Sequence, residues 1–372
     1  MTRRLLTLLG IAVICVVLFH STVYGFNSLF FWTNRYADVS VPNFDQYGTP
    51  TYYSLLFIRR AVAFGVGVFL FVSGYFVAFA TGRKNETIEW KVIWTRILYL
   101  LIPYFIWSTV IFTGKALAYG QILSPMEYVR RFLLGQATTA YYYVPLICQL
   151  YVVSRFMVPL AKKHWKLFLV TTAVIQFAVQ ALRYFNLLDI SNPTIDTLIR
   201  LTPIWFFPIR IFWFALGLVI GFHFKQFKEF LMRTRWVFLV ATILLLIASL
   251  VEFETLLHLT NMDWRRVASF SPISSTLYGI SFIFTFLAFD KLSRPLPAEL
   301  SDIGTKSYGV YLLTDQVLDL TGTLMYRFTP WVLGNQLLYQ IVMVAAGLGI
   351  PLLLMNRISK SPARRMYRYL FG

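Results

Sequence analysis

The chain has 372 residues, of which 58% are hydrophobic, 18% are aromatic and only 13% are charged. This composition excludes a soluble domain built around a single core and indicates a protein with many membrane-spanning segments. Lys and Arg outnumber Asp and Glu by 34 to 16, but the basic residues form short clusters between apolar runs. That pattern is typical of membrane topology, so nucleic acid is not expected as a partner.

Apolar runs of roughly twenty residues, the length that crosses about 30 Å of hydrocarbon, follow one another along the whole chain. They predict an all-α, polytopic transmembrane helical bundle of about ten helices, and a single membrane-embedded domain over residues 1–372. The predicted spans are 5–23, 54–80, 96–117, 141–161, 166–186, 204–223, 236–256, 270–289, 307–326 and 335–356.

Basic residues concentrate on alternate connections between these spans. If the N-terminus is cytoplasmic, the inner segments hold about 21 of the 34 basic residues and about 6 of the 16 acidic ones. Because inner loops carry the excess of Lys and Arg, both termini are predicted to be cytoplasmic. We therefore expect a multi-pass protein of a cell membrane, the inner membrane in a bacterium.

One outer connection carries a helix signal of its own. Ser124-Pro125-Met126-Glu127 has the pattern of a capping box with proline at the first helical position. Apolar and basic residues then alternate, which predicts a short amphipathic helix on the outer surface.

A few charged side chains fall inside the predicted spans. His20 lies in the outer third of the first span, and an ionisable group at such a depth is expensive, so it indicates function by default. Residues at a similar level, or closer to the midplane, are Arg59, Arg60, Arg210, Asp315 and Asp319. The alternative is structural: ion pairs between helices, and an imidazole that is hydrogen-bonded between helices.

His20 supports two kinds of chemistry. A neutral imidazole takes a proton from a hydroxyl nucleophile near neutral pH, which suits acyl transfer. A histidine in a polar pathway equally suits a proton-coupled transporter. The chain contains no Gly-x-Ser-x-Gly elbow, no His-Glu-x-x-His zinc pattern and no glycine-rich phosphate loop. No metal site is expected.

Several short patterns together resemble one family. Val68 to Phe76, VFLFVSGYF, resembles the Phe-Phe-x-x-Ser-Gly-Phe signature of the acyltransferase 3 family of membrane acyltransferases, and Ile14 to His20, ICVVLFH, is similar to the end of its first helix. In the same order as in that family come KVIWTRILYLLIPYFIWS (Lys91 to Ser108), YYYVPLICQLY (Tyr141 to Tyr151), the segment Arg210 to Gly217, and SYGVYLL (Ser307 to Leu313). The resemblance covers essentially the whole chain.

The resemblance implies transfer of an acyl group, usually acetyl, from cytoplasmic acyl-CoA to a sugar hydroxyl at or beyond the outer face. His20 matches the catalytic histidine of the family, acyl-CoA is a donor substrate rather than a permanently bound cofactor, and Ser73 is a candidate donor to the oxyanion. Candidates for the coenzyme phosphates on the inner side are Arg83, Lys84, Lys91, Arg96 and Arg155. The alternative for each of these is a plain topology signal.

The chain also departs from the family pattern. Leu9 stands where many members have an arginine, eleven positions before the histidine. Cys148 and its neighbours replace an acidic pair of the fourth helix, and Thr314, followed by Asp315, stands where a late histidine is often found. These departures suggest a divergent branch.

The leading hypothesis is an integral membrane O-acyltransferase with His20 as base, Arg59, Arg60, Ser73, Arg210, Asp315 and Asp319 around its pocket, and the bilayer, acyl-CoA and a glycan as partners. The alternative is a proton-coupled secondary transporter of polysaccharide precursors or other small polar solutes, which uses His20, Asp315 and Asp319. It would predict inverted repeats, and none is evident. A third hypothesis is a non-catalytic scaffold of envelope assembly. Gly65, Gly67, Gly217 and Gly221 are predicted to allow close helix packing.

Overall fold

All regular secondary structure in the described residues is helical. The computed structural model describes residues 2–82, 84–289 and 297–372, and within these ranges the regular elements are α-helices and short 3-10 segments. In lipid a single segment satisfies its own backbone hydrogen bonds only as a helix, which explains why the apolar runs fold in this way. The predicted all-α class is confirmed.

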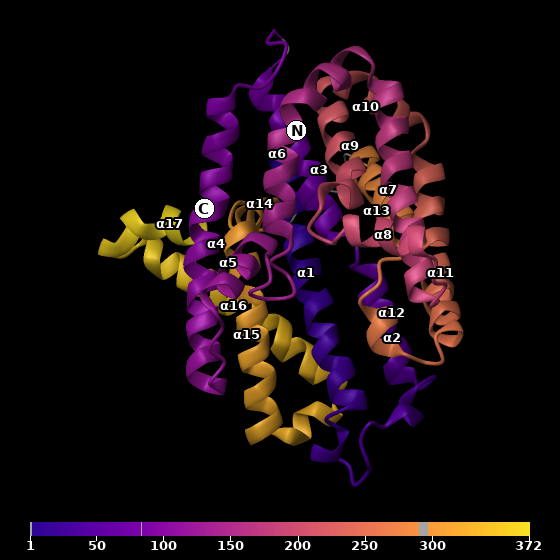
Figure 1. Ribbon diagram of the computed structural model, residues 1–372, viewed down its shortest axis with the longest axis vertical. Coiled ribbons are helices and arrows are strands. Elements are labelled where there is room, and N and C mark those ends of the chain that lie inside the picture. The colour runs from indigo at the N-terminus through magenta and orange to yellow at the C-terminus, as the bar shows by residue number, and fades with distance from the viewer. Residues whose placement is uncertain (1, 83, 290–296) are drawn as a thin grey trace. The chain divides into compact units, whose positions relative to one another are not determined.

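The helices are shown in Figure 1 with the labels used below. They are α1 (Thr2–Phe30), α2 (Pro50–Ala61), α3 (Gly65–Thr81), α4 (Trp90–Tyr119), α5 (Pro125–Leu134), α6 (Tyr143–Lys163), α7 (Trp165–Leu187), α8 (Pro193–Leu201), α9 (Ile211–Phe222), α10 (Phe224–Arg233), α11 (Arg235–Leu259), α12 (Trp264–Ala268), α13 (Ile273–Ala288), α14 (Pro297–Thr305), α15 (Ser307–Phe328), α16 (Gln336–Ser359) and α17 (Tyr367–Phe371). The 3-10 segments are η1 (Thr33–Arg35), η2 (Phe44–Gln46), η3 (Phe207–Arg210), η5 (Pro330–Gly334) and η6 (Pro362–Met366).

Most of the predicted spans correspond to candidate membrane spans. Eight helices in the described ranges are long and apolar enough to cross a membrane. The number is nine if Phe207–Phe222 (η3 and α9) and the bent α10 are counted together as one further span. The predicted span 307–326 is present as α15 but is not among these candidates, because Asp315 and Asp319 add charge to a helix of lower hydropathy. The protein is a polytopic helical membrane protein.

Several helix boundaries differ from the prediction, and α4, for example, begins at Trp90 instead of residue 96. α1 continues to Phe30, about two turns beyond the predicted end of the first span. The predicted second span is interrupted at residues 62–64, between α2 and α3. The sixth span begins as the 3-10 segment η3, and after α9 the chain turns by 103° into α10.

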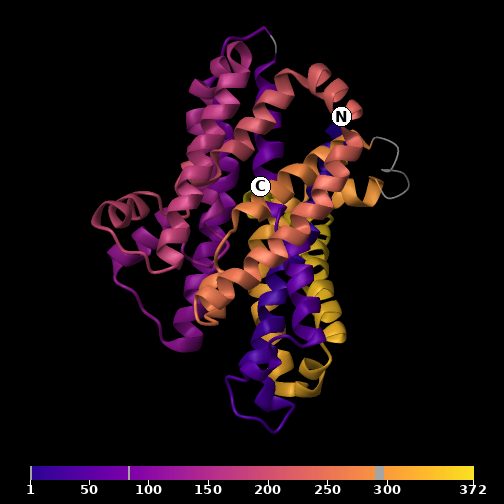
Figure 2. The same cartoon turned by 90° about the vertical axis from the view of Figure 1, so that its right-hand side faces the viewer.

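Contacts between residues divide the chain into two compact units. Unit 1 consists of Met1–Gly65, Ile102–Leu123 and Leu296–Gly372, and in it α1 packs against α2, α14, α15 and α16 (Figure 2). Two glycines allow α1 and α14 to touch: a Cβ on Gly10 would overlap the Leu300 carbonyl oxygen, and one on Gly304 would overlap the Leu6 carbonyl oxygen. The start of α1 and α14, the helix that precedes α15, therefore lie side by side within unit 1.

Unit 2 consists of Val66–Leu101 and Ser124–Pro295. In it α9 packs against α6 and α7, and α11 packs against α13. A Cβ on Gly74 of α3 would overlap the Phe214 carbonyl oxygen of α9, and a Cβ on Gly217 of α9 would overlap the Phe71 carbonyl oxygen of α3. Gly74, the glycine of the Ser-Gly pattern, is thus where the backbones of two helices meet.

The other glycines singled out from the sequence also pack closely. A Cβ on Gly65 would lie 2.6 Å from the Val16 side chain, one on Gly67 2.7 Å from the Trp213 ring, and one on Gly221 2.5 Å from the Ala78 side chain. The predicted packing role of these positions is confirmed, in line with the small residues that allow membrane helices to approach.

Hydrogen bonds between side chains join α11 to α13 and cap α13. Ser249 pairs with Ser275 at 2.7 Å, and Thr242 pairs with Ser281 at 3.0 Å. The Glu252 carboxylate accepts from the hydroxyls of Tyr184 and Ser274 and from the Ser274 N–H at 3.2 Å. Tyr184 accepts from the Ile273 N–H at 2.8 Å. Since the first N–H groups of a helix lack intrahelical partners, this cluster satisfies the start of α13.

The capping box predicted from the sequence is present in α5. The Ser124 hydroxyl accepts from the Glu127 N–H at 3.3 Å, and Gly135 ends the helix in the left-handed conformation at φ 69°. The Arg131 guanidinium donates to the Glu127 carboxylate at 2.9 Å and thereby lowers the pKa of Glu127. The short helix is confirmed, and its place on the outer surface stays a prediction.

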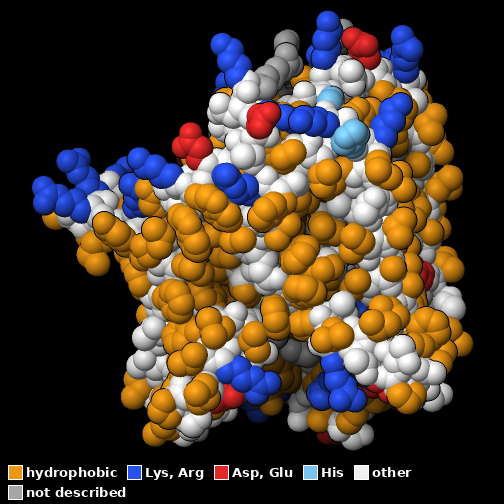
Figure 3. Space-filling model, turned by 45° about the horizontal axis from the view of Figure 1, so that its top comes forward, with side chains coloured by type: hydrophobic (Ala, Val, Ile, Leu, Met, Phe, Trp, Pro, Cys, Tyr) orange, Lys and Arg blue, Asp and Glu red, His pale blue; other side chains and the backbone are white. Residues whose placement is uncertain are grey.

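Large hydrophobic side chains are exposed over the candidate spans. Figure 3 shows hydrophobic side chains over most of the visible face. In α11, Trp236, Val237, Val240 and Leu244 are each more than half exposed. A soluble protein rarely exposes so many, so these side chains are expected to contact lipid.

Candidate functional site

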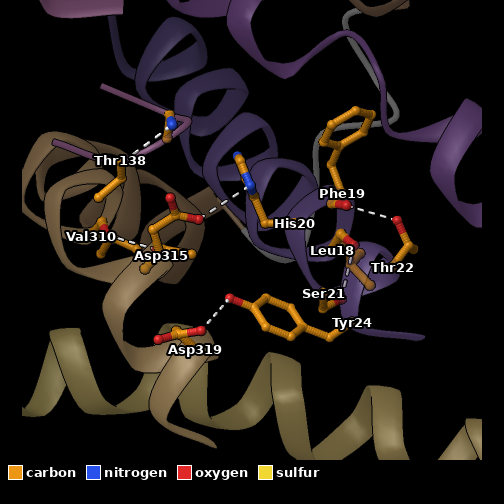
Figure 4. A network of polar contacts seen from close by, with 12 residues as sticks. Leu18, Phe19, His20, Ser21, Thr22, Tyr24, Thr138, Val310, Asp315 and Asp319 are labelled. Carbon is orange, nitrogen blue, oxygen red and sulfur yellow. Dashed lines mark hydrogen bonds and ion pairs between the residues drawn. The ribbon is translucent and has the colours of Figure 1, made fainter. Parts of the chain in front are cut away.

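The side chain of His20 points from α1 to a carboxylate on α15 (Figure 4). Its Nδ1 atom lies 3.5 Å from Oδ1 of Asp315, and the two side chains are only 21% and 15% exposed. A carboxylate beside Nδ1 favours the tautomer with its proton on that atom, which leaves the Nε2 lone pair free to accept a proton. The arrangement can act as a base or carry a proton.

A second pair follows one helical turn further along both helices. The Tyr24 hydroxyl donates to Oδ1 of Asp319 at 3.4 Å (Figure 4). Because Tyr24 is four residues after His20 and Asp319 is four residues after Asp315, each pair of neighbours lies on one face of its helix. The predicted grouping of His20, Asp315 and Asp319 is therefore present within unit 1.

Arg59 also lies beside the segment of α1 that contains His20. Its Nη1 donates to the Phe19 carbonyl at 3.3 Å and to the Thr22 hydroxyl at 3.2 Å. The guanidinium lies 4.1 Å from the centroid of the Phe19 ring, a cation–π geometry. Arg59 and Arg60 are 3% and 1% exposed. Arg59 therefore binds the backbone of α1 near the histidine, which supports both the predicted site and its structural alternative.

Ser73 and Arg210, also predicted for the pocket, belong to unit 2. Ser73 lies in α3 and is hydrogen-bonded to Tyr143. Arg210 ends η3 and occupies the N-cap position of α9. Their role beside His20 stays a prediction.

The residues predicted for the coenzyme phosphates differ in their surroundings. Arg83 lies outside the described residues, whereas the side chains of Lys84 and Lys91 are exposed. Arg155 donates to the Ile88 carbonyl at 2.8 Å and lies 5.3 Å over the Trp90 ring. Arg96 donates to the Phe76 carbonyl at 3.0 Å. The two arginines thus already bind backbone oxygens, while the two lysines are accessible to an anion.

Sequence reasoning missed Lys162, Tyr24 and Tyr339. Lys162 donates to the carbonyls of Gly82 and Asn85 at 2.8 and 2.6 Å, which holds the connection after α3 against the end of α6. For Tyr24 a signal was available, because a tyrosine four residues after His20 faces whatever contacts that histidine. Tyr339 gave no local signal.

The fold and the site define a multi-pass membrane protein with a histidine–carboxylate pair inside its helical bundle. A family model described as an acyltransferase domain, acyltransferase 3, matches residues 8–356, and the chain belongs to this family. The resemblance drawn from the short patterns is thereby confirmed.

Relatives come from bacteria. The probable poly-beta-1,6-N-acetyl-D-glucosamine export protein of Staphylococcus aureus strain MSSA476 is 24% identical over 273 residues, and that of strain MRSA252 is 25% identical over 278 residues. Each match covers 71% of this chain and 71% of the relative. No solved structure matches the chain.

Proposed function

We propose that the protein is an O-acyltransferase of the bacterial inner membrane. It transfers an acyl group, acetyl in the simplest case, from cytoplasmic acyl-CoA to a hydroxyl of a cell-surface or lipid-linked carbohydrate. The observation that carries the proposal is the pairing of His20 with Asp315 in a chain of the acyltransferase 3 family. The relatives are named as probable export proteins of an N-acetylglucosamine polymer, which supports a carbohydrate as the acceptor.

In the proposed reaction His20 serves as a general base. Nε2 takes the proton of the acceptor hydroxyl while the hydroxyl oxygen attacks the thioester carbonyl carbon. The C–S bond then breaks, and the imidazolium returns its proton to the leaving thiolate, so no net proton is released. Asp315 holds the imidazole in the required tautomer and stabilises its charged form, a division of labour common to histidine bases.

The remaining predicted residues have supporting roles in the proposal. Ser73, Arg60 and Arg210 are candidates to donate hydrogen bonds to the oxyanion that forms at the thioester carbonyl. Arg59, which already donates to the Phe19 carbonyl, is a candidate to hold α1 and His20 in place. The exposed lysines Lys84 and Lys91 are the better candidates to bind the coenzyme phosphates, because Arg96 and Arg155 already bind backbone carbonyls.

The proposal is tested by replacing the base. His20→Ala is expected to lower acyl transfer by about 10²–10⁴-fold, the usual contribution of a general base. Mass spectrometry of glycans from cells that hold equal amounts of wild-type or variant protein measures the acyl marks. His258→Ala, which replaces an exposed histidine at the end of α11, is the matched control. Unchanged acylation in His20→Ala would exclude His20 as the base.

The second candidate, a proton-coupled transporter, is favoured by one specific observation. The relatives are named as export proteins, and the His20–Asp315 pair can also carry a proton. Proteoliposomes that hold the purified protein separate the two functions. Movement of a glycan driven by a pH gradient without acyl-CoA supports transport, whereas acetylated glycan formed only with acetyl-CoA supports acyl transfer.

A further inference from the structure

Two matched polar pairs line the contact between α1 and α15. His20 faces Asp315, and Tyr24 faces Asp319 (Figure 4). The partners of each pair are 295 residues apart in the sequence. Because the separation is the same, α1 and α15 run parallel and in register over this stretch. The Tyr24–Asp319 pair therefore lies roughly 6 Å along the helix axis from the His20–Asp315 pair.

Aromatic rings extend this polar stretch away from His20. The Trp32 ring, which follows the end of α1, lies 6.3 Å from the Tyr24 ring and 5.2 Å from the Tyr326 ring of α15. All three rings are partly exposed. The Arg35 guanidinium lies 5.0 Å from the Tyr326 ring centroid and covers part of that ring. Such rings combine an apolar face with a polar edge, which suits the mixed surface of a sugar.

A third tyrosine lies behind Tyr24 and carries an unsatisfied hydroxyl. Tyr339 of α16 is fully buried, and among the described residues its hydroxyl has no hydrogen-bond partner. Gly322 of α15 makes room for both rings: a Cβ there would lie 3.1 Å from the Tyr24 ring and 3.4 Å from the Tyr339 hydroxyl. Buried hydroxyls are normally paired, so this one is free to bind a group that enters beside Tyr24.

We propose that Tyr24, Asp319 and Tyr339 form the subsite that binds the acceptor saccharide next to His20, and that the saccharide is uncharged. The Asp319 carboxylate accepts from sugar hydroxyls, while the tyrosine hydroxyls donate to sugar oxygens. Asp319, whose hydrogen-bond partner Tyr24 is neutral, places a negative charge in the subsite and disfavours an anionic sugar, because like charges repel most strongly where water is scarce. This assignment rests on the proposed acyl transfer and names its acceptor class.

The subsite also orients the reacting hydroxyl. A sugar ring bound at Tyr24 and Asp319 is one helical turn from His20, so the hydroxyl of that ring or of the next one reaches Nε2. In this arrangement Tyr24 and Asp319 bind the acceptor, and His20 alone takes the proton. Loss of the subsite therefore affects acceptor binding, and loss of His20 affects turnover.

Binding is measured on the purified full-length protein without acyl-CoA. The probe is a β-1,6-linked N-acetylglucosamine tetrasaccharide, and a hexuronic acid tetrasaccharide is its anionic counterpart. Wild type is expected to bind the uncharged probe at least about tenfold more tightly than the anionic one. Tyr24→Phe, Tyr339→Phe and Asp319→Asn are each expected to weaken binding of the uncharged probe by about tenfold. The two tyrosine variants each remove a hydrogen-bond donor, and Asp319→Asn removes one acceptor oxygen and the charge of the other. Tyr53→Phe and Asp45→Asn, at exposed positions, are the controls.

The outcomes separate the subsite from the chemistry. Tetrasaccharide binding that is absent in wild type, equal in all variants, or stronger for the anionic probe overturns the subsite. If wild type binds the uncharged probe through these residues but transfers no acyl group, the subsite stands and the proposed function fails. If wild type transfers acyl groups and the KM for the acceptor is the same in all variants, the function stands and the subsite fails. Thermal unfolding of each variant confirms that it is folded.

Discussion

At the scale of single residues, the proposed function depends on the pair of His20 and Asp315. An ionisable group in a membrane helix is costly unless it is paired, and the pair of His20 with Asp315 supplies that compensation. The pair also fixes the imidazole, since only Nδ1 faces the carboxylate. A structural pair and a catalytic pair have the same geometry, so variants that keep the shape of Asp315 distinguish them.

Asp315→Asn preserves the size of the side chain and removes its charge. In the proposed reaction the variant is expected to lower kcat by about 10²-fold or more, because the imidazole loses its orienting partner and the imidazolium loses its counter-charge. The KM for the glycan is expected to stay close to the wild-type value. Steady-state kinetics with acetyl-CoA and a glycan acceptor measure both constants.

Asp45→Asn, at an exposed position after α1, is the control for this measurement. An Asp315→Asn enzyme with wild-type kcat would show that the carboxylate only stabilises the bundle.

The candidate site was predicted from the sequence only where a residue type is rare in its surroundings. His20 and the two aspartates differ from the apolar residues around them, and within unit 1 the structure brings them together. Tyr24 and Tyr339 were missed because the chain has 22 tyrosines, many of them in apolar runs. Burying a tyrosine in a membrane helix costs little free energy, so its presence there does not indicate a function. Only the fold reveals which tyrosines face a carboxylate or lack a hydrogen-bond partner.

At the scale of helices, backbone contact through glycine explains the Ser-Gly pattern of α3. Gly74 and Gly217 bring the backbones of α3 and α9 into direct contact. Without a hydrophobic force between helices in lipid, this close approach supplies much of their packing energy. Gly74 therefore holds α3, and with it Ser73, in a fixed position.

Gly74→Ala is expected to destabilise the protein by about 1–3 kcal/mol, because the added methyl group overlaps the Phe214 carbonyl and forces the helices apart. Thermal unfolding of the purified protein in detergent measures the change as a lower Tm. Gly114→Ala in α4 and Gly349→Ala in α16 are matched controls, since nothing lies within 4 Å of a Cβ at either position. An equal Tm for Gly74→Ala and these controls would contradict the packing role.

Helix positions followed from hydropathy, but breaks and bends did not. The apolar runs gave the place of each span, although the ends of α1 and α4 differ by six or seven residues, and local capping residues gave α5. The interruption at residues 62–64 and the turn of 103° at His223 contain no proline and no special pattern. Hydropathy measures how long a segment is, whereas the direction of a helix depends on the neighbours against which it packs.

For the whole molecule, the two compact units are not contiguous in the sequence. Unit 1 combines the start of the chain with about its last fifth and a piece of α4. Sequence patterns gave the membrane class, the helical architecture and the family, but not this division, because composition does not say which helices become neighbours. The parallel contact of α1 with α15 is the clearest example.

The predicted topology is tested by labelling single cysteines in a variant that lacks Cys15 and Cys148. In spheroplasts, Asp45→Cys and Gln121→Cys are expected to react with a membrane-impermeant maleimide, whereas Lys84→Cys reacts only after the membrane is permeabilised. The physical reason is the excess of basic residues on the inner connections. All three positions are exposed. If only Lys84→Cys reacted in intact spheroplasts, the topology would be the opposite of the predicted one.

The cap of α13 has a consequence for how the protein is made. Its partners, Tyr184 and Glu252, come from α7 and α11, both of which precede α13 in the chain. Because a chain emerges from the ribosome N-terminal end first, both partners are synthesised before α13. The acceptors for the first amides of α13 thus exist before those amides are made, so α13 is expected to be capped as soon as it packs against α7 and α11.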